Sequence, residues 1–335
     1  MAKSVKLKKI ALIIVITGMF SLAVKHAATD NNLPQIVLEV SKKKGWVTVV
    51  SSFTRSEGSY IAVKIGEEKK VVYRGNHRHP RPGPVSVSAN GKKLVFAQFV
   101  DTTGSEQAVR KICTIGIDGS EYSEVLDIKD IFHDIAWSHD QRKIAFLGEL
   151  KDGFLGLVVL DVSTRPSVMV ARRPLPRGIS FMKMTSQAWA PDNERLVYVN
   201  ANGRMVIFNV RTNSEDDVGP GDEPTWSRAG AFIAYRADES GKPPGDYFRM
   251  SLVPPRRSER LLSNSRSAAD IRESRGHYLG PPIWSPDDRF MMIMRIIARR
   301  SVEFEQAYVV DVSTRASSPL PPGSMGDIRS WGGHP

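Results

Sequence analysis

The chain has 335 residues, a formal net charge of +11 and a single cysteine, Cys113. One cysteine excludes an intramolecular disulfide, and a lone thiol on a predicted strand is best interpreted as a small core residue. The length behind the N-terminal segment is large for one core but normal for a fold built by radial repetition.

Residues 1–23 predict a signal peptide. Lysines at positions 3, 6, 8 and 9 precede an uncharged, largely apolar run over residues 10–24. This run is shorter than the ~20 residues of a comfortable membrane span, and small residues before position 24 offer a cleavage point. The alternative is an uncleaved membrane anchor through residues 10–24. Both interpretations predict an exported protein, either periplasmic or secreted.

Residues 24–45 are interpreted as a linker with one candidate strand, Ile36–Val40, and residues 46–335 as a single domain. The first part of that domain predicts three strands, at residues 46–51, 59–65 and 69–73. These strands have no inner strand of their own in the N-terminal region.

One twelve-residue pattern recurs through the rest of the chain and reads IAWSHDQRKIAF in its clearest copy. A short apolar run ending in Trp is followed by a polar turn and then by a β-branched and aromatic run, which is typical of a β-hairpin. The five full copies cover residues 85–96, 135–146, 187–198, 224–235 and 282–293, and RSWGGHP at the C-terminus is a shortened sixth. The anchor positions are Val87, Trp137, Trp189, Trp226, Trp284 and Trp331.

A second hairpin follows most copies, as in LVVLDVSTR, MVIFNVRTN and AYVVDVSTR, so each unit has about four strands. Neighbouring anchors are 37 to 58 residues apart. Repeats of this length with four strands each are typical of the blades of a β-propeller. A generic all-β sandwich is the alternative, and five turn-centred copies in register disfavour it.

The W-S-P-D hairpin followed by an apolar strand resembles the WD-like repeat of TolB-like six-bladed β-propellers. The resemblance extends from Trp46 to Trp331, with Val87 in place of the first Trp and Ala229 in place of the fourth turn Asp. We expect an all-β, six-bladed propeller of four-stranded blades. Pairing of the C-terminal strand with the N-terminal strands is expected to close it and to protect the sheet edge.

The connections between units are less uniform than the turns, and binding residues are often found on such loops. Residues 74–83 and 171–183 are basic and contain no acid, whereas the connections at residues 127–134 and 215–223 are acidic. This alternation does not form a funnel of one sign that would steer a polyanion. The simplest alternative is that these loops only keep a basic protein soluble. The candidate ligand-binding residues are His77, Arg78, His79, Arg81, Arg172, Arg173 and Arg177.

No metal site and no cofactor are predicted. Arg78, between His77 and His79, repels a cation, and no carboxylate lies nearby in the sequence. The sequence has no G-x-S-x-G, HExxH or P-loop pattern, so no catalytic residue is assigned. The turn carboxylates Asp140, Asp192 and Asp287 are interpreted as turn caps, and His139 as a structural residue.

The predicted function is a non-catalytic binding or scaffold propeller of the cell envelope or exterior. The resemblance implies protein–protein interaction, and the basic charge also fits an anionic envelope polymer. Nucleic acid does not fit the export signal, the membrane is reached only through the candidate anchor, and a monomer is expected. The alternative is a polysaccharide lyase or hydrolase. The resembled propellers include lyases that use a metal and histidines, and His133 and His277 lie on predicted connections.

Overall fold

The structure is a computed structural model, and it describes the chain in ten stretches. They are residues 47–54, 58–65, 68–75, 84–100, 109–176, 182–237, 245–263, 280–299, 302–319 and 328–332. All regular structure in these stretches is β, and none of the described residues form a helix that could cross a membrane. The predicted signal segment and linker lie outside them, as do His77, Arg78, His79, Arg81 and Arg177.

The first sheet joins the two ends of the described chain. Its order is β22-β1-β2-β3, with β22 (Ile328–Gly332), β1 (Val47–Thr54), β2 (Gly58–Ile65) and β3 (Glu68–Arg74). The antiparallel register aligns Thr48 with Trp331 and Val50 with Ile328. The shortened sixth copy of the repeat therefore supplies the strand that the three N-terminal strands lack.

The second sheet has seven strands and contains two copies of the repeat, which had been expected to form separate four-stranded units. The reason is β7, whose 15 residues serve first as the outer strand of one copy and then as the inner strand of the next. Register shifts near Ile128 and Ile131 allow this change of role. The order is β10-β9-β8-β7-β6-β5-β4, with β10 (Val168–Pro174), β9 (Leu155–Asp161), β8 (Lys143–Leu150), β7 (Ser123–Trp137), β6 (Val109–Gly116), β5 (Lys93–Val100) and β4 (Val85–Val87).

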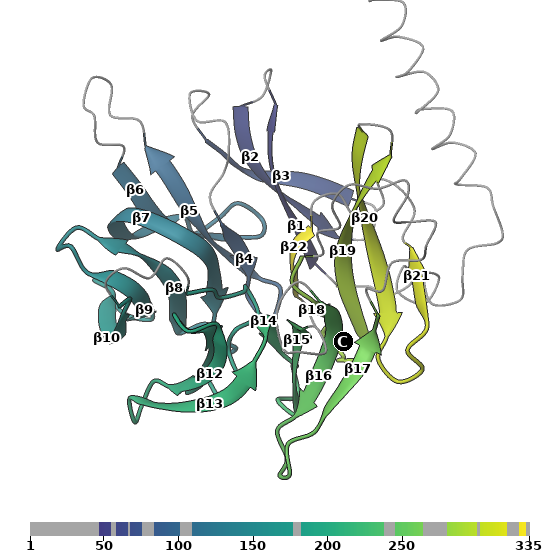
Figure 1. The fold of residues 1–335 in the computed structure, drawn as a ribbon. Coiled ribbons are helices and arrows are strands. Elements are labelled where there is room, and N and C mark those ends of the chain that lie inside the picture. The colour runs from purple at the N-terminus through teal and green to yellow at the C-terminus, as the bar shows by residue number, and fades with distance from the viewer. Residues whose placement is uncertain are drawn as a thin grey trace, which may run out of the picture.

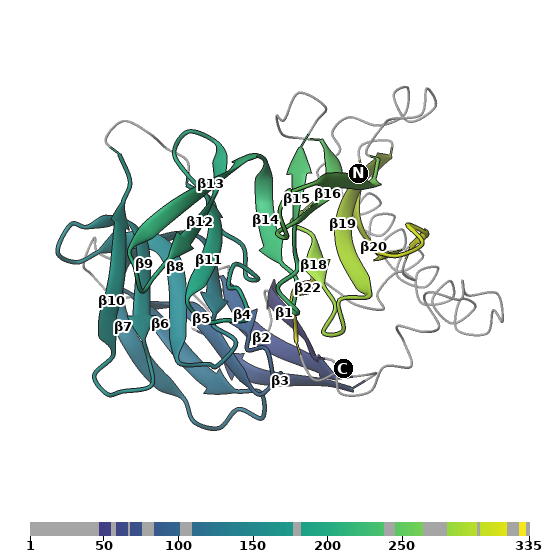
Figure 2. The ribbon, with the colours of Figure 1, turned by 90° about the horizontal axis from the view of Figure 1, so that it is seen from below.

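Three smaller sheets follow. The third is β11 (Arg195–Val199), β12 (Arg204–Asn209) and β13 (Ser214–Pro220), where isolated bridges at Trp189 and Lys183 stand in for an inner strand. The fourth is β14 (Asp222–Trp226), β15 (Phe232–Ala237), β16 (Asp246–Ser251) and β17 (Ser258–Leu262). The fifth is β18 (Ile283–Trp284), β19 (Phe290–Arg299), β20 (Val302–Asp311) and β21 (Ser317–Pro319). Strands β4, β14, β18 and β22 lie toward the middle in both views, and β10 and β13 lie toward the periphery (Figures 1 and 2).

The core consists of apolar clusters between neighbouring sheets, and the anchor tryptophans are among its largest members. Trp189 packs with Leu157 from β9 and Phe208 from β12, and its side chain is 1% exposed. Truncating a buried Trp to Ala typically costs about 3–5 kcal/mol, so Trp137, Trp189, Trp226 and Trp284, which are all buried, contribute strongly to holding one sheet against the next. Val87, which replaces the Trp in the first copy, is also buried.

Several segments expected to be charged loops are strands. The acids at positions 127, 130 and 134 lie in β7, those at 215–217 lie in β13, and Ala171 to Pro174 belong to β10. The outer strands have solvent on their flanks, so they accept charges that an inner strand would exclude. Their polar composition therefore hides the alternation by which strands are predicted.

Candidate functional site

The polar turns after the inner strands are held by their own side chains. Ser138 Oγ donates to Asp140 Oδ1 at 2.6 Å, and the same carboxylate oxygen accepts from the Arg142 backbone N–H at 3.0 Å. The fifth copy repeats this arrangement, with Ser285 Oγ donating to Asp287 Oδ1 at 2.6 Å. The interpretation of these carboxylates as turn caps is confirmed.

A second set of hydrogen bonds links each of two turns to the turn of the preceding copy. Asn193 and Asp288 both lie four residues after their tryptophan anchor, with φ of 61° and 55°. Asn and Asp tolerate this left-handed conformation better than most residues. Asn193 Oδ1 accepts from the Asp140 backbone N–H at 2.8 Å. Asp288 accepts from the backbone N–H groups of Arg228 and Ala229, each at 2.6 Å.

Each of these links from a side chain to the backbone of the preceding turn is here called a latch. The Asp288 latch explains how the fourth copy can have Ala229 at the position where the turns of the second, third and fifth copies have Asp. The carboxylate that satisfies the Ala229 backbone N–H comes from the following copy instead of from its own turn. The fourth and fifth copies are therefore joined by a charged side chain rather than by apolar packing alone.

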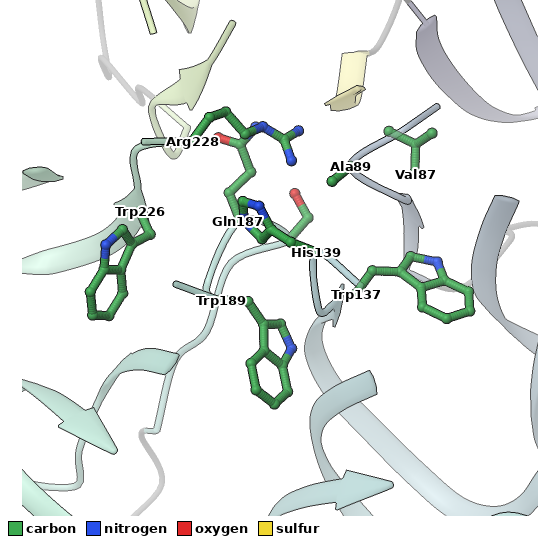
Figure 3. A pocket seen from close by; sticks show the side chains of 9 residues that line it. Val87, Ala89, Trp137, His139, Gln187, Trp189, Trp226 and Arg228 are labelled. Carbon is green, nitrogen blue, oxygen red and sulfur yellow. The ribbon is translucent and has the colours of Figure 1, made fainter. Parts of the chain in front are cut away.

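Beside these turns lies a small cavity, here called the turn cavity (Figure 3). It is lined by Val87, Ala89, Trp137, His139, Ser186, Gln187, Trp189, Trp226 and Arg228. It offers about 10 Å³ to the centre of a water molecule, close to the smallest volume that holds one water. The cavity brings together the first four copies of the repeat but is too small for a sugar or a peptide side chain.

Burial controls the ionisation of two titratable side chains in the turn cavity, Arg228 and His139. Burial lowers the pKa of Arg228 to about 10, although the nearby Asp288 carboxylate opposes the shift. Burial also lowers the pKa of His139 to about 4, and the positive charge of Arg228 adds to this effect. At neutral pH the arginine is therefore charged and the histidine neutral. Burial raises the pKa of Asp288, while its backbone donors and Arg228 act in the opposite direction.

Gln187 connects three copies of the repeat at the edge of the turn cavity. Its side-chain Nε2 donates to the Trp284 carbonyl at 3.1 Å, and its Oε1 accepts from the Trp284 backbone N–H at 2.7 Å. Its own backbone carbonyl accepts from the Trp226 N–H at 2.8 Å. The third copy is thus hydrogen-bonded to both the fourth and the fifth.

A second concentration of charge, here called the ionic cluster, lies where the inner segments of the third and fourth sheets begin. Lys183 Nζ donates to both oxygens of Asp222, at 2.9 and 2.7 Å. Arg236 Nη2 lies 3.6 Å from Asp222, and Arg236 Nε lies 2.8 Å from Glu223. The Asp222 and Arg236 side chains are only 4% and 3% exposed. Two cations and two carboxylates are therefore balanced in a largely buried setting.

Of the predicted binding residues, the structure describes Arg172 and Arg173, and it places them on opposite faces of β10. The Arg172 guanidinium lies over the Phe154 ring and pairs with Asp152 at 2.9 Å. The Arg173 guanidinium lies over the Phe208 ring, in the cluster shared with the third sheet, and pairs with Glu215 at 3.1 Å. These two arginines do not converge on one surface.

The described residues hold no group of three or more His, Cys, Asp or Glu side chains placed to bind a metal ion. The ionic cluster and the turn cavity were both missed by sequence reasoning. Asp222 and Glu223 were interpreted as loop acids, and Lys183 as the end of a basic loop. The recurrence of Asn or Asp four residues after an anchor was the signal that could have revealed the latches.

Comparison with solved structures identifies the fold. TolB from Acinetobacter baumannii matches with a TM-score of 0.58 and 14% identity, over 86% of this chain and 66% of that one. A TolB-like protein from Agrobacterium tumefaciens matches with a TM-score of 0.52 and 15% identity, over 83% and 88%. A periplasmic gluconolactonase from Pseudomonas aeruginosa matches with a TM-score of 0.51 and 14% identity, over 87% and 100%. The chain has a fold of the β-propeller type.

The chain spans less than two thirds of the Acinetobacter protein. No protein-family model and no curated protein matches the sequence.

Proposed function

We propose that the chain is a six-bladed propeller of the TolB-like type, closed where β22 pairs with β1, and that it acts as a non-catalytic binding module. The observation that carries this proposal is the state of the ionisable groups beside the inner segments. Those of the ionic cluster are held in ion pairs, and His139 is kept neutral by burial. A general acid or base works best with a pKa near the operating pH, so this arrangement favours a scaffold.

The proposed location is the cell envelope or exterior. The lysines before the apolar run of residues 10–24 support export, and one structural neighbour is described as periplasmic. The proposed partner is a protein or an anionic envelope polymer, bound through the connections between blades. The basic segments 74–83 and 171–183 supply the arginines, which suit carboxylate and phosphate groups.

The test measures binding and turnover in the same sample. The full chain is incubated with polygalacturonate as a representative anionic polymer, and, separately, cross-linked in its own envelope extract. We expect a saturable complex with a defined protein or with the polymer, weakened by salt, and polymer chains of unchanged length. Shortened or unsaturated oligosaccharides, detected by mass spectrometry, would instead establish the alternative of a polysaccharide lyase or hydrolase.

A matched pair of variants locates the binding surface. Replacing the predicted arginines at 78, 81 and 172 by Ala should weaken the complex with little change in thermal stability. Arg173 is left in place because its guanidinium packs on Phe208 in the core. The control replaces three other arginines, all exposed, at 142, 211 and 257. If both variants bind alike at low salt, the two basic segments are not the binding surface.

A further inference from the structure

The outer strands of the sheets differ in what they present to solvent. Outer strands of natural sheets are usually protected by charges, Pro or short length, because an open edge recruits other strands. Strand β13 carries three consecutive acids, β17 carries a Glu-Arg pair, and β21 has only three residues and ends in Pro. Strand β10 differs, because Val168 and Val170 are 54% and 41% exposed. The first half of β10 therefore lacks the protection by charge that β13 and β17 have.

Strand β10 is also the end of its sheet. It pairs with β9, and no other described strand lies on its far side (Figure 2). A bulge between Met169 and Ala171 twists the strand, and Pro174 has no N–H to donate. The edge open to a further strand is therefore short, from Val168 to Arg172.

We propose that this edge binds a short extended segment of a partner protein, which adds a strand to the sheet beside β10. Main-chain hydrogen bonds would supply the affinity, and side chains at alternate positions would supply the specificity. The segment would place β-branched or aromatic side chains beside Val168 and Val170. The inference rests on the proposed binding function and names one surface and one class of partner for it.

Arg172 indicates that the segment carries a carboxylate. Its side chain is 40% exposed and pairs with Asp152, which is 52% exposed. An ion pair this exposed contributes little, and a guanidinium has five donors, so a second carboxylate can share it. A second copy of the chain fits less well. It would bring another strand with two arginines and no acid to the same edge, on a molecule of net charge +11.

The experiment selects a random 12-residue peptide library against the full chain. The variant Val168→Lys/Val170→Lys serves for counter-selection, because both side chains are exposed and their replacement leaves the core intact. We expect the enriched peptides to alternate β-branched or aromatic residues with polar ones and to contain Asp or Glu. Their affinity should fall at least tenfold on the double variant, and they should slow hydrogen exchange at the amides of residues 168–172.

Val253→Lys is the matched control. This valine is 68% exposed but lies between β16 and β17, where it offers no strand edge. It should leave peptide affinity unchanged. The proposal is overturned if no peptide is enriched, or if the enriched peptides bind the double variant equally well. It is also overturned if the chain is a dimer that the double variant converts to a monomer, since a second copy is then the occupant.

The failures of the two proposals are distinguishable. Peptides or polymers that bind without protecting residues 168–172 remove the β10 edge and leave the binding function standing. Cleavage of a polysaccharide removes the binding function, whatever the peptides do.

Discussion

The ionic cluster and the turn cavity both hold buried cations, but they balance the charge in different ways. In the ionic cluster, Lys183 and Arg236 face two carboxylates, and Asp222 forms ion pairs with both cations. In the turn cavity, Arg228 is near one carboxylate, Asp288, whose oxygens also accept two backbone N–H groups. The ionic cluster thus has as many carboxylates as cations. In the turn cavity, the Asp288 side chain alone serves both as the countercharge of Arg228 and as the acceptor of two backbone N–H groups.

The difference shows how repeated units are joined. The ionic cluster connects Lys183 of one sheet to the first residues of the next, so it fixes where the inner segments begin. The Asp288 latch connects turns, so it fixes where those segments end. Removing one partner from either region leaves a buried charge without its countercharge, which lowers the stability of the folded protein.

The largest expected effect is that of Asp222→Ala. This change leaves Arg236 paired with Glu223 alone and removes the ion pair between Lys183 and Asp222. Breaking a buried ion pair typically costs about 3–5 kcal/mol, and we expect about 4 kcal/mol in urea unfolding. Asp217→Ala, which removes an exposed pair with Arg204, is the control and should cost under about 1 kcal/mol. Equal losses in the two variants would contradict the view of the ionic cluster as a buried network.

Asp288→Ala should have the next largest effect, about 3 kcal/mol, because two backbone donors lose their acceptor and Arg228 loses its nearby countercharge. The double variant Asp288→Ala/Arg228→Met removes that charge as well. Its loss of stability should be smaller than that of Asp288→Ala alone, measured by thermal unfolding. A double variant that is less stable than the single one would show that Arg228 does not depend on Asp288.

His139 should make stability depend on acid pH. Its pKa is lowered to about 4 in the folded protein, so the unfolded chain, with a pKa near 6.5, takes up the proton first as pH falls. Stability present above pH 6.5 is therefore lost between pH 6.5 and 4, by about 3 kcal/mol. Burial of the ring is the main cause of the lowered pKa, and Arg228, Asp140 and Asp192 act on the same ring. His139→Gln should flatten this part of the pH profile. Identical profiles would contradict the assignment.

The smallest expected effect is that of Asn193→Gly. Gly keeps the positive φ of 61° but removes the Oδ1 that accepts from the Asp140 N–H. The loss of one hydrogen bond should cost about 1 kcal/mol. Asn213→Gly is the control, because Asn213 also has a positive φ, of 58°, but lies within a single hairpin. If Asn193→Gly is no worse than its control, the latch between the second and third copies contributes nothing measurable.

The strands of the repeat could be predicted because they are buried on both faces and therefore form short, continuous apolar runs next to a turn. Leu94, Ile144, Leu196 and Ile233 occupy one repeat position in these runs and are fully buried. The outer strands could not be predicted from the same signal. In β13, the first four residues are all exposed, so both faces are polar and no apolar pattern remains.

The candidate site was harder to predict because it is formed by residues far apart in the sequence. Asp288 and Arg228 are 60 residues apart, and Asn193 and Asp140 are 53 apart. The Asn or Asp four residues after an anchor marks a side chain that can form a latch, but this local pattern does not indicate which turn the side chain will reach. Arg172 and Arg173 show the same limit, since two adjacent arginines on a strand point to opposite faces.

The bond between Gln187 and Trp284 has a consequence for the order of folding. The two residues are 97 positions apart, and both groups are buried. Until the fifth copy is in place, the Gln187 carboxamide lacks its partner at Trp284 and stays hydrated. A chain in which the fifth copy has not yet folded would therefore keep this part of the third copy open to chaperones and to other chains.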